Sequence, residues 1–316
     1  MEEPIKAIIW CVPRSCSTAL LKSLSSLPDA KIFNELYSVA FVFGPEGPIM
    51  NKQSPSEEKQ PAQEEDQPTD ESQSDDGYVF PSSICTFQWV KQMLEGDYPG
   101  RRVIFSKEMA YCLYGKYECL PQGYRHVFLL RHPSKTFPSF KKQAYDTIRR
   151  FYQTEYQIPP TMEELQFDKL NPEQSPIWLA FKEVHDLYQH VKERKLEEDP
   201  LVIDTDDLMS HPAAVMSALC AKLGLQYSNA LLTWDKGLGT VETWTQGKEI
   251  KRLIEHTSGF ENFRNSTGFH RQEADKQATA SPGEVKVTPD IQLCIDKSLP
   301  FYLKMYEKRI KVDGNS

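Results

Sequence analysis

The sequence predicts an α/β fold in which a parallel sheet is flanked by helices on both faces, and two observations support this. Short apolar segments alternate along the chain with longer segments of helical periodicity, as is typical of parallel sheets covered by helices. Several of the apolar segments are nearly continuous runs, as expected of strands buried on both faces. We expect one domain over residues 1–316, because the chain contains no internal repeat and one α/β domain can have this length.

The expected elements follow in order from these local patterns. The strand candidates are Ile5–Cys11, Ala30–Phe33, Arg102–Ser106, His126–Arg131 and Leu201–Asp204. The helix candidates have apolar residues three or four positions apart, and they are Ser17–Leu27, Thr86–Leu94, Ser134–Arg150, Pro176–Leu196, Pro212–Leu223 and Asp290–Arg309.

Residues 51–77 differ from the rest of the chain in composition. They include nine acidic residues, two lysines and no large apolar side chain, and so hold a charge of −7 out of the formal −8. A segment with nothing to bury cannot offset the entropy lost on ordering, so we expect a disordered acidic insertion. A plain solvated loop is preferred over a phosphorylation site or a tether. The remaining chain is nearly neutral, which gives no support for a nucleic-acid-binding surface.

Targeting and redox features favour a cytoplasmic protein. The first residues are acidic, unlike those of a signal peptide, and no window approaches the roughly 18 uncharged apolar residues of a membrane span. Seven cysteines without a Cys-x-x-Cys pair favour reduced thiols over a disulfide framework or a zinc site. No cluster of acidic, histidine or cysteine residues has metal-ligand spacing, so no metal is expected.

Polar residues follow four of the expected strands, where open parallel sheets bind their ligands. These are Pro13–Thr18, Lys107 with Glu108, Arg131–Ser134 and Asp204–Asp207. The last, acidic turn is compatible with magnesium, but a turn that caps the helix at 212–223 explains it better.

The first loop, "PRSCST", has the features of an anion site. Backbone N–H groups at a helix start are unpaired and suit an anion, hydroxyls stand at positions 15, 17 and 18, and Arg14 adds a forked cation. Simple N-capping by these hydroxyls is the alternative. No G-x-x-x-x-G-K-[ST] sequence occurs, which disfavours an ATPase or GTPase of the Walker type.

The second stretch, "RHPSKTFPS", has Arg131 at a strand end and Ser139 eight residues later in a helix. Together they are suited to a second phosphate. The alternative is an exposed arginine and an ordinary helix serine.

The two stretches in this order resemble the sulfotransferase family that uses 3′-phosphoadenosine 5′-phosphosulfate (PAPS). Three further segments are similar to elements of that family: "NELYSVAFVFGPEG", "LVIDTDDLMSHPAAVMSALCAKLGL" and "NSTGF". The matches run in order from about residue 5 to residue 270 and leave 51–77 unmatched. The resemblance therefore implies a P-loop-like sulfotransferase architecture.

The resemblance also implies roles for individual residues. In that family the first loop binds the 5′-phosphosulfate and the second pair binds the 3′-phosphate. The residues expected to contact the nucleotide are Arg14, Ser15, Cys16, Ser17, Thr18, Arg131, Ser139, Ser266, Thr267 and Gly268. Members that act on phenols and steroids have lysine and glycine where this chain has Arg14 and Cys16, so a slightly different loop geometry is expected.

The expected catalytic residues are Glu108 and Arg14. Phenol-type members place a histidine after the third strand, whereas this chain has Lys107 and Glu108, and carbohydrate-type members use glutamate in that neighbourhood. Glu108 would take the acceptor's proton, and Arg14 would stabilise the leaving phosphate. A surface ion pair is the alternative for Glu108. Glu35 and Tyr37 are expected to face the acceptor, with loop packing as the alternative.

These expectations define three candidate functions. The preferred one is a PAPS-dependent sulfotransferase acting on a hydroxyl or amine of a small-molecule acceptor, without nucleic acid or membrane as a partner. The second is an inactive PAPS- or PAP-binding protein that acts as a sensor or scaffold. The third, an ATP-dependent phosphotransferase, is disfavoured by the missing Walker lysine.

Overall fold

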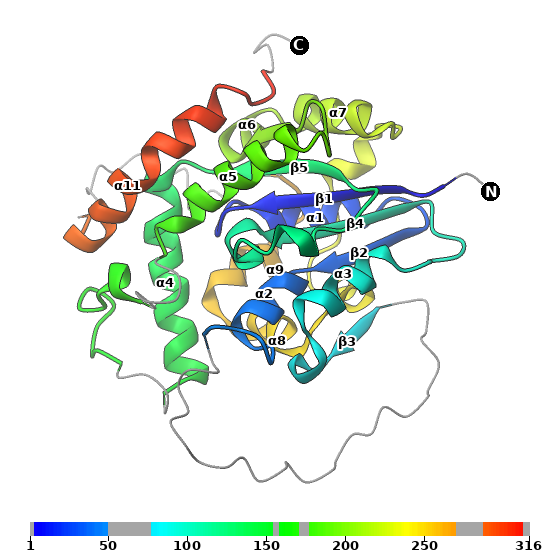
Figure 1. Ribbon diagram of the computed structural model, residues 1–316. Coiled ribbons are helices and arrows are strands. Elements are labelled where there is room, and N and C mark those ends of the chain that lie inside the picture. Colours follow the sequence, from blue (N-terminus) through cyan, green and yellow to red (C-terminus); the bar gives the residue numbers. More distant parts are fainter. Residues whose placement is uncertain (1–2, 50–76, 154–157, 171–176, 270–286, 312–316) are drawn as a thin grey trace, which may run out of the picture.

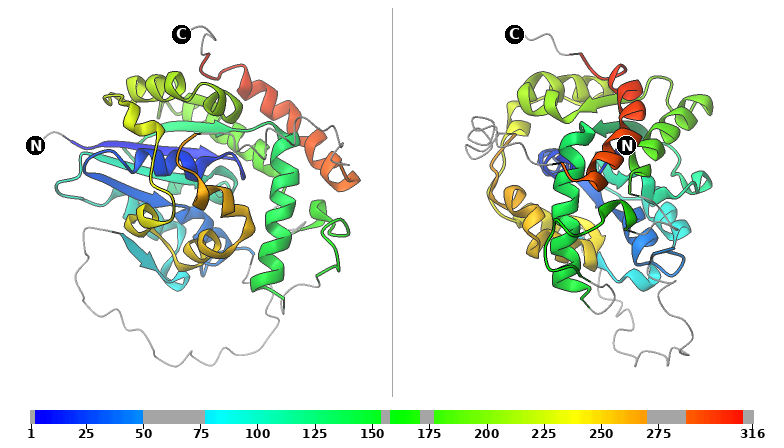
Figure 2. Two further views of the ribbon diagram at one scale, coloured as in Figure 1. Left: turned by 180° about the vertical axis from the view of Figure 1, so that it is seen from behind. Right: turned by 90° about the vertical axis from the view of Figure 1, so that its left-hand side faces the viewer.

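The structure is a computed structural model that describes residues 3–49, 77–153, 158–170, 177–269 and 287–311. A parallel sheet lies at its centre, with α5 and α3 on one face and α1 on the other (Figures 1 and 2). This arrangement confirms the predicted α/β class. The acidic insertion expected at 51–77 lies outside the described residues except for Gly77.

The sheet has seven parallel strands within the described residues, in the order β3-β7-β2-β4-β1-β5-β6. Their bounds are β1 Ile5–Cys11, β2 Ala30–Asn34, β3 Tyr78–Phe80, β4 Val103–Met109, β5 Arg125–Leu130, β6 Leu201–Asp204 and β7 Thr245–Gly247. β1 lies between β4 and β5, with Ala7 opposite both Phe105 and Arg125. Its residues from Ala7 to Cys11 are almost completely buried, which explains the continuous apolar run in the sequence.

The helices include all six that the periodicity predicted, with ends shifted by a few residues. Their bounds are α1 Ser17–Leu24, α2 Leu36–Val42, α3 Phe87–Glu95, α4 Pro133–Phe151, α5 Leu179–Glu193, α6 Thr205–Ser210, α7 Pro212–Leu223, α8 Lys248–His256, α9 Glu261–Asn265 and α11 Pro289–Tyr306. No helix among the described residues is long and apolar enough to cross a membrane.

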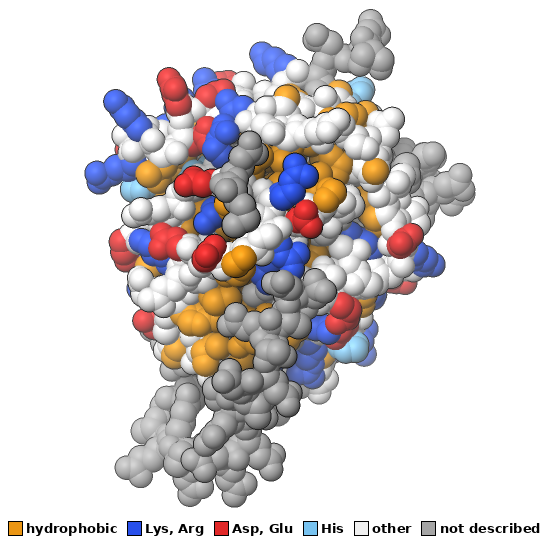
Figure 3. Space-filling view, turned by 90° about the vertical axis from the view of Figure 1, so that its right-hand side faces the viewer, with side chains coloured by type: hydrophobic (Ala, Val, Ile, Leu, Met, Phe, Trp, Pro, Cys, Tyr) orange, Lys and Arg blue, Asp and Glu red, His pale blue; other side chains and the backbone are white. Residues whose placement is uncertain are grey.

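The arrangement leaves one edge of the sheet for a ligand. In Figure 1, α4 stands across the carboxyl ends of the strands. The opposite face of the molecule, at the right of Figure 1, has charges of both signs intermixed (Figure 3). The carboxyl-terminal edge is also where such sheets bind ligands, so the polar residues predicted to gather there can be located.

Candidate active site

A cavity of about 560 Å³ opens at the carboxyl ends of the strands. Most of the residues that the sequence marked as ligand-binding line it: Arg14, Cys16, Ser17, Thr18, Glu35, Arg131, Ser139, Ser266 and Gly268. They come from the segments that follow β1, β2 and β5, from α1 and α4, and from the loop after α9, so the fold brings together residues that are far apart in the chain.

The loop between β1 and α1 has an unusual backbone. Arg14 and Cys16 both have positive φ angles, 61° and 59°. Left-handed residues within a turn let neighbouring N–H groups point to the same side and form an anion-binding concavity. No described side chain caps α1, so simple N-capping does not explain the hydroxyls of Ser17 and Thr18, which line the cavity.

Ser15 does not fill its expected role through its side chain. Its hydroxyl is fully buried and donates a hydrogen bond to the carbonyl oxygen of Val12 at 2.8 Å. Its own carbonyl oxygen lies 2.8 Å from the hydroxyl of Thr205, at the start of α6. Ser15 therefore joins the loop to the start of α6. Its hydroxyl is turned to Val12, so a contact with the ligand through its backbone N–H stays the prediction.

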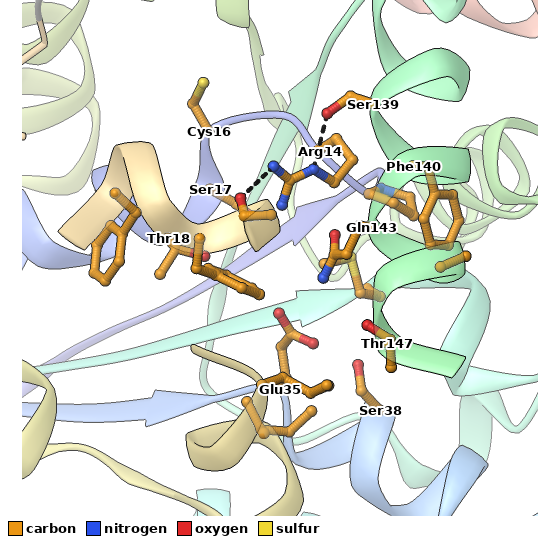
Figure 4. Close-up of a pocket in the computed structure, with 18 of the residues that line it drawn as sticks. Arg14, Cys16, Ser17, Thr18, Glu35, Ser38, Ser139, Phe140, Gln143 and Thr147 are labelled. Atoms are coloured by element: carbon orange, nitrogen blue, oxygen red, sulfur yellow. Dashed lines mark hydrogen bonds between the residues drawn. The ribbon is translucent and has the colours of Figure 1, made fainter. Parts of the chain in front are cut away.

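Arg14 is held in place by two elements outside its own loop. Its Nε donates to Ser139 Oγ at 3.0 Å, and its Nη2 donates to the carbonyl oxygen of Gly259 at 2.6 Å (Figure 4). Gly259 has no side chain and can therefore lie close to α4. A Cβ atom at this position would lie 2.9 Å from Gln143 Cγ. Burial lowers the pKa of Arg14, and the charge of Arg131 acts in the same direction.

Arg131 supports the same loop and leaves one donor unused. Its Nη1 donates to the carbonyl oxygen of Arg14 at 2.8 Å, while its Nε is buried and has no hydrogen-bond partner in the described structure. Neither Arg14 nor Arg131 forms an ion pair with a described carboxylate. Two cations without a direct ion-pair partner among the described residues, at one end of a cavity, are suited to an anionic ligand.

The acidic turn after β6 is occupied by other contacts. Asp204 caps α6 by accepting the N–H of Asp206 at 2.8 Å, not the helix at 212–223 as expected. Asp206 pairs with Lys135, and Asp207 pairs with Arg309. Across the described ranges no group of three His, Cys, Asp or Glu residues could hold a metal ion.

Glu35 is the carboxylate that the structure places in the cavity. It follows β2 with a φ of 57°, precedes α2 and forms an ion pair with Lys107 of β4. The Lys107 side chain is fully buried, whereas 12% of the Glu35 side chain is exposed. In Figure 4 the Glu35 carboxylate points into the space below Arg14 and Gln143. Glu35 therefore lines the cavity, and that it faces the acceptor stays a prediction.

Glu108 does not lie where it was expected. It is part of β4, is fully buried and does not line the cavity. Its carboxylate accepts the N–H groups of Leu36 and Tyr37, each at 3.0 Å, and the hydroxyl of Ser106 at 2.8 Å. Glu108 therefore caps the first turn of α2, and its expected position at the crevice is wrong. Successive side chains of a strand point to opposite faces, so the sequence could equally have assigned either neighbour to the site.

Tyr37 is likewise a packing residue. It is fully buried, its hydroxyl donates to the carbonyl oxygen of Cys119 at 2.5 Å, and its ring stacks on Trp10 with a centroid distance of 6.0 Å. The loop-packing alternative holds for Tyr37.

The position of Glu108 predicts a pH dependence of stability. Burial raises the pKa of Glu108 to about 8, and the hydrogen bonds from Ser106, Tyr37 and Leu36 offset only part of this. The folded state therefore favours the neutral form of Glu108. The contribution of this group to the free energy of unfolding is complete below its ordinary pKa of 4.5 and is lost as the pH rises toward 8. Relative to Glu108→Gln, the parent should lose roughly 3–5 kcal/mol of unfolding free energy over that window.

Urea unfolding of both proteins at a series of pH values measures this difference. A difference that stays constant with pH would contradict the raised pKa. Turnover per folded molecule should change little in Glu108→Gln, because the group does not reach the cavity.

The late loop contributes two of its three expected residues. Ser266 and Gly268 line the cavity, and Ser266 Oγ accepts a hydrogen bond from Trp234 Nε1 at 3.1 Å. Thr267 is exposed and does not line the cavity, because the bridge between Thr233 and Gly268 turns it outward. The expectation for Thr267 is wrong.

Sequence reasoning missed several polar lining residues, including Ser38, Gln143, Thr147 and Asn262. Gln143 and Thr147 follow Ser139 at intervals of four residues in α4, and residues at this spacing lie on one face of a helix. That signal was available once Ser139 had been singled out. Ser38 could not be found in this way, because α2 was not predicted.

The family comparison bears on the later part of the chain and does not cover the loop sequences at 13–18 and 131–139. A sulfotransferase-domain family model matches residues 180–275. The chain is similar to sulfotransferases. The match confirms the predicted resemblance over this stretch, which contains β6, β7 and the late loop. No curated protein sequence matches the chain.

Solved sulfotransferase structures align with most of the chain at low identity. The sulfotransferase domain from the curacin biosynthetic pathway is 16% identical over 94% of this chain and 98% of its own, with a TM-score of 0.45. The domain from the olefin synthase of Synechococcus PCC 7002 is 16% identical over 94% of this chain and 95% of its own, with a TM-score of 0.46. A mouse sulfotransferase complexed with PAP is 12% identical over 96% of this chain and 86% of its own, with a TM-score of 0.39.

Proposed function

We propose that the protein is a single-domain sulfotransferase that transfers the sulfuryl group of PAPS to a hydroxyl or amine of a small-molecule acceptor. The observation that carries this proposal is the cavity itself. It joins two arginines that lack a carboxylate partner among the described residues to a carboxylate, Glu35, at the end of β2, which β4 separates from β1. The family match supports the same reaction class.

The residues present fit a ligand with two phosphate groups. The N–H groups at the start of α1, with the hydroxyls of Ser17 and Thr18, suit the 5′-phosphosulfate. The unpaired Nε of Arg131 suits the 3′-phosphate. Ser139 can join it, since its hydroxyl accepts from Arg14 and still has a hydrogen to donate. Ser266 and Gly268 would bound the nucleotide on the side of the late loop.

The chemistry requires a base and a stabilised leaving group. PAPS supplies the sulfuryl group, which moves as the bond from acceptor oxygen or nitrogen to sulfur forms and the bond from sulfur to phosphate oxygen breaks. Glu35 would take the acceptor's proton, and Lys107 would hold the Glu35 carboxylate in position. Arg14 would stabilise the negative charge that develops on the departing phosphate.

Calorimetric titration of the protein with PAP, adenosine and ATP tests the cofactor assignment. PAP should bind about 100-fold or more tightly than adenosine, because two charge-assisted contacts contribute about 1.5 kcal/mol each. Binding should not require magnesium, since arginines supply the positive charge. Equal affinity for ATP and PAP, or an absolute metal requirement, would contradict the two-phosphate assignment.

A matched pair of variants at the two ends of β5, at Arg125 and at Arg131 just after the strand, locates the 3′-phosphate. Arg131→Ala should weaken PAP binding by about tenfold or more, the value of one charge-assisted contact. Arg125→Ala should leave PAP affinity unchanged, because Arg125 lies at the other end of β5 and pairs with Glu197. Tight PAP binding with no turnover of any acceptor would favour the sensor alternative.

A further inference from the structure

The cavity continues beyond Glu35 as an apolar arm between α2 and α4. In Figure 4 the residues of the first loop lie on one side of Glu35, and Ser38 and Thr147 lie on the other. We define the apolar arm by five lining residues: Phe41, Val42, Tyr111, Ala144 and Ile148. Phe41 and Tyr111 meet edge to face at a centroid distance of 5.9 Å. Aromatic and branched side chains therefore form both walls.

Polar groups in the arm are few, and none is a cation. Among the described lining residues, the cations are Arg14 and Arg131. Both lie at the end of the cavity formed by the loop between β1 and α1. The polar groups on the walls beyond Glu35 include the hydroxyls of Ser38, Thr147 and Tyr111, with Gln143 opposite Glu35 (Figure 4). Ser38 Oγ is buried and interacts with the Cys112 thiol.

This lining discriminates between classes of acceptor. A sugar would bring several hydroxyls that lose their hydrogen bonds to water, and each one left unpaired costs free energy. A hydrocarbon gains free energy in proportion to the apolar area that it buries. A hydrocarbon body therefore suits these walls better than a sugar does. The hydroxyl of such an acceptor would stand next to Glu35.

We propose that the acceptor is a hydrophobic alcohol, with its hydroxyl at Glu35 and its hydrocarbon body in the apolar arm. This inference rests on the proposed function and narrows its acceptor from any small molecule to one chemical class.

Turnover with PAPS and a series of linear alcohols, from 1-butanol to 1-decanol, tests the class. The ratio kcat/KM should rise about threefold to fourfold per added methylene until the arm is full, which is about 0.8 kcal/mol per group. Glucose at the same concentration should react far more slowly than 1-decanol. A ratio that does not change with chain length, or a preference for glucose, would overturn the proposal.

A variant that narrows the arm tests its location. Ala144→Leu should lower kcat/KM for 1-decanol at least tenfold, lower it less for 1-butanol, and leave PAP affinity unchanged. Ala213→Leu makes the same change at an exposed position of α7 and should alter none of these values. If Ala144→Leu lowers the melting temperature sharply, Ile148→Ser, which makes the same wall polar, replaces it. An unaltered chain-length response in a folded arm variant would overturn the proposal.

Direct binding separates this inference from the proposed function. Titration of the PAP-loaded protein with 1-decanol should show binding with a negative heat-capacity change, the mark of apolar burial. PAP binding without 1-decanol binding would overturn the acceptor class and leave the proposed function intact. Absence of PAP binding would overturn the proposed function and this inference with it.

Discussion

Glu35→Gln should lower turnover about 10²–10⁴-fold while PAP binding persists, because the variant keeps the shape of the side chain and removes the proton acceptor. Glu35 is the carboxylate that lines the cavity, whereas Glu108 is enclosed under α2. Rates with a saturating acceptor, together with calorimetric titration with PAP, measure both quantities. If Glu35→Gln keeps most of the parent's activity, another group is the base.

Stability has to be separated from catalysis in this experiment, because Glu35 pairs with a fully buried lysine. Removing one partner of a buried pair leaves the other charge uncompensated, which can cost about 3–5 kcal/mol. The double variant Glu35→Gln, Lys107→Met removes both charges and should recover much of that loss. Its turnover should stay low. Recovery of turnover along with stability would mean that Glu35 matters for folding and not as a base.

The two glutamates show how far sequence reasoning reached at this site. The pattern after the third expected strand correctly located charged residues near the carboxyl edge, but it placed Glu108 beyond the strand, whereas β4 continues to Met109. Within a strand, Lys107 and Glu108 must point to opposite faces. Which one faces the cavity depends on how the strand packs on α2, and α2 was not among the predicted helices.

The central strands and long helices were predictable because burial fixes their patterns. β1 and β6 have the predicted bounds, and so does α7, since each is an apolar or periodic segment with clear ends. β3 and β7 were missed because each has three residues, and Thr245–Gly247 contains no apolar side chain at all. Their positions follow from the pairing of β7 with β2 and of β3 with β7 across the sheet, which is long-range information.

For the loop between β1 and α1, the sequence predicted the type of site but not the contacts of its residues. Arg14 and Ser139 were assigned to different phosphates, yet the structure joins them by a hydrogen bond. That contact depends on α4 crossing the strand ends and on the close approach of Gly259 to α4. Local sequence patterns do not contain such distances.

Arg14→Ala should cost on the order of 3 kcal/mol of transition-state stabilisation, a fall in kcat of about 10²–10³-fold, as when one preorganised donor to a developing oxyanion is lost. The physical reason is preorganisation, because Ser139 and Gly259 fix the guanidinium at the loop that would hold the departing phosphate. Arg14→Lys keeps the charge but replaces the rigid fork by a single ammonium. It should recover only part of the rate.

Ser139→Ala is the matched control, since it frees Arg14 Nε without removing the guanidinium. It should weaken PAP binding and lower kcat less than Arg14→Ala does, because the contact to Gly259 remains. Single-turnover rates of the three variants with PAPS and a fixed acceptor, set beside their PAP affinities, give the comparison. If Arg14→Ala lowers PAP affinity and leaves kcat at the parent's value, Arg14 binds the ground state alone, and leaving-group stabilisation must come from the N–H groups at the start of α1.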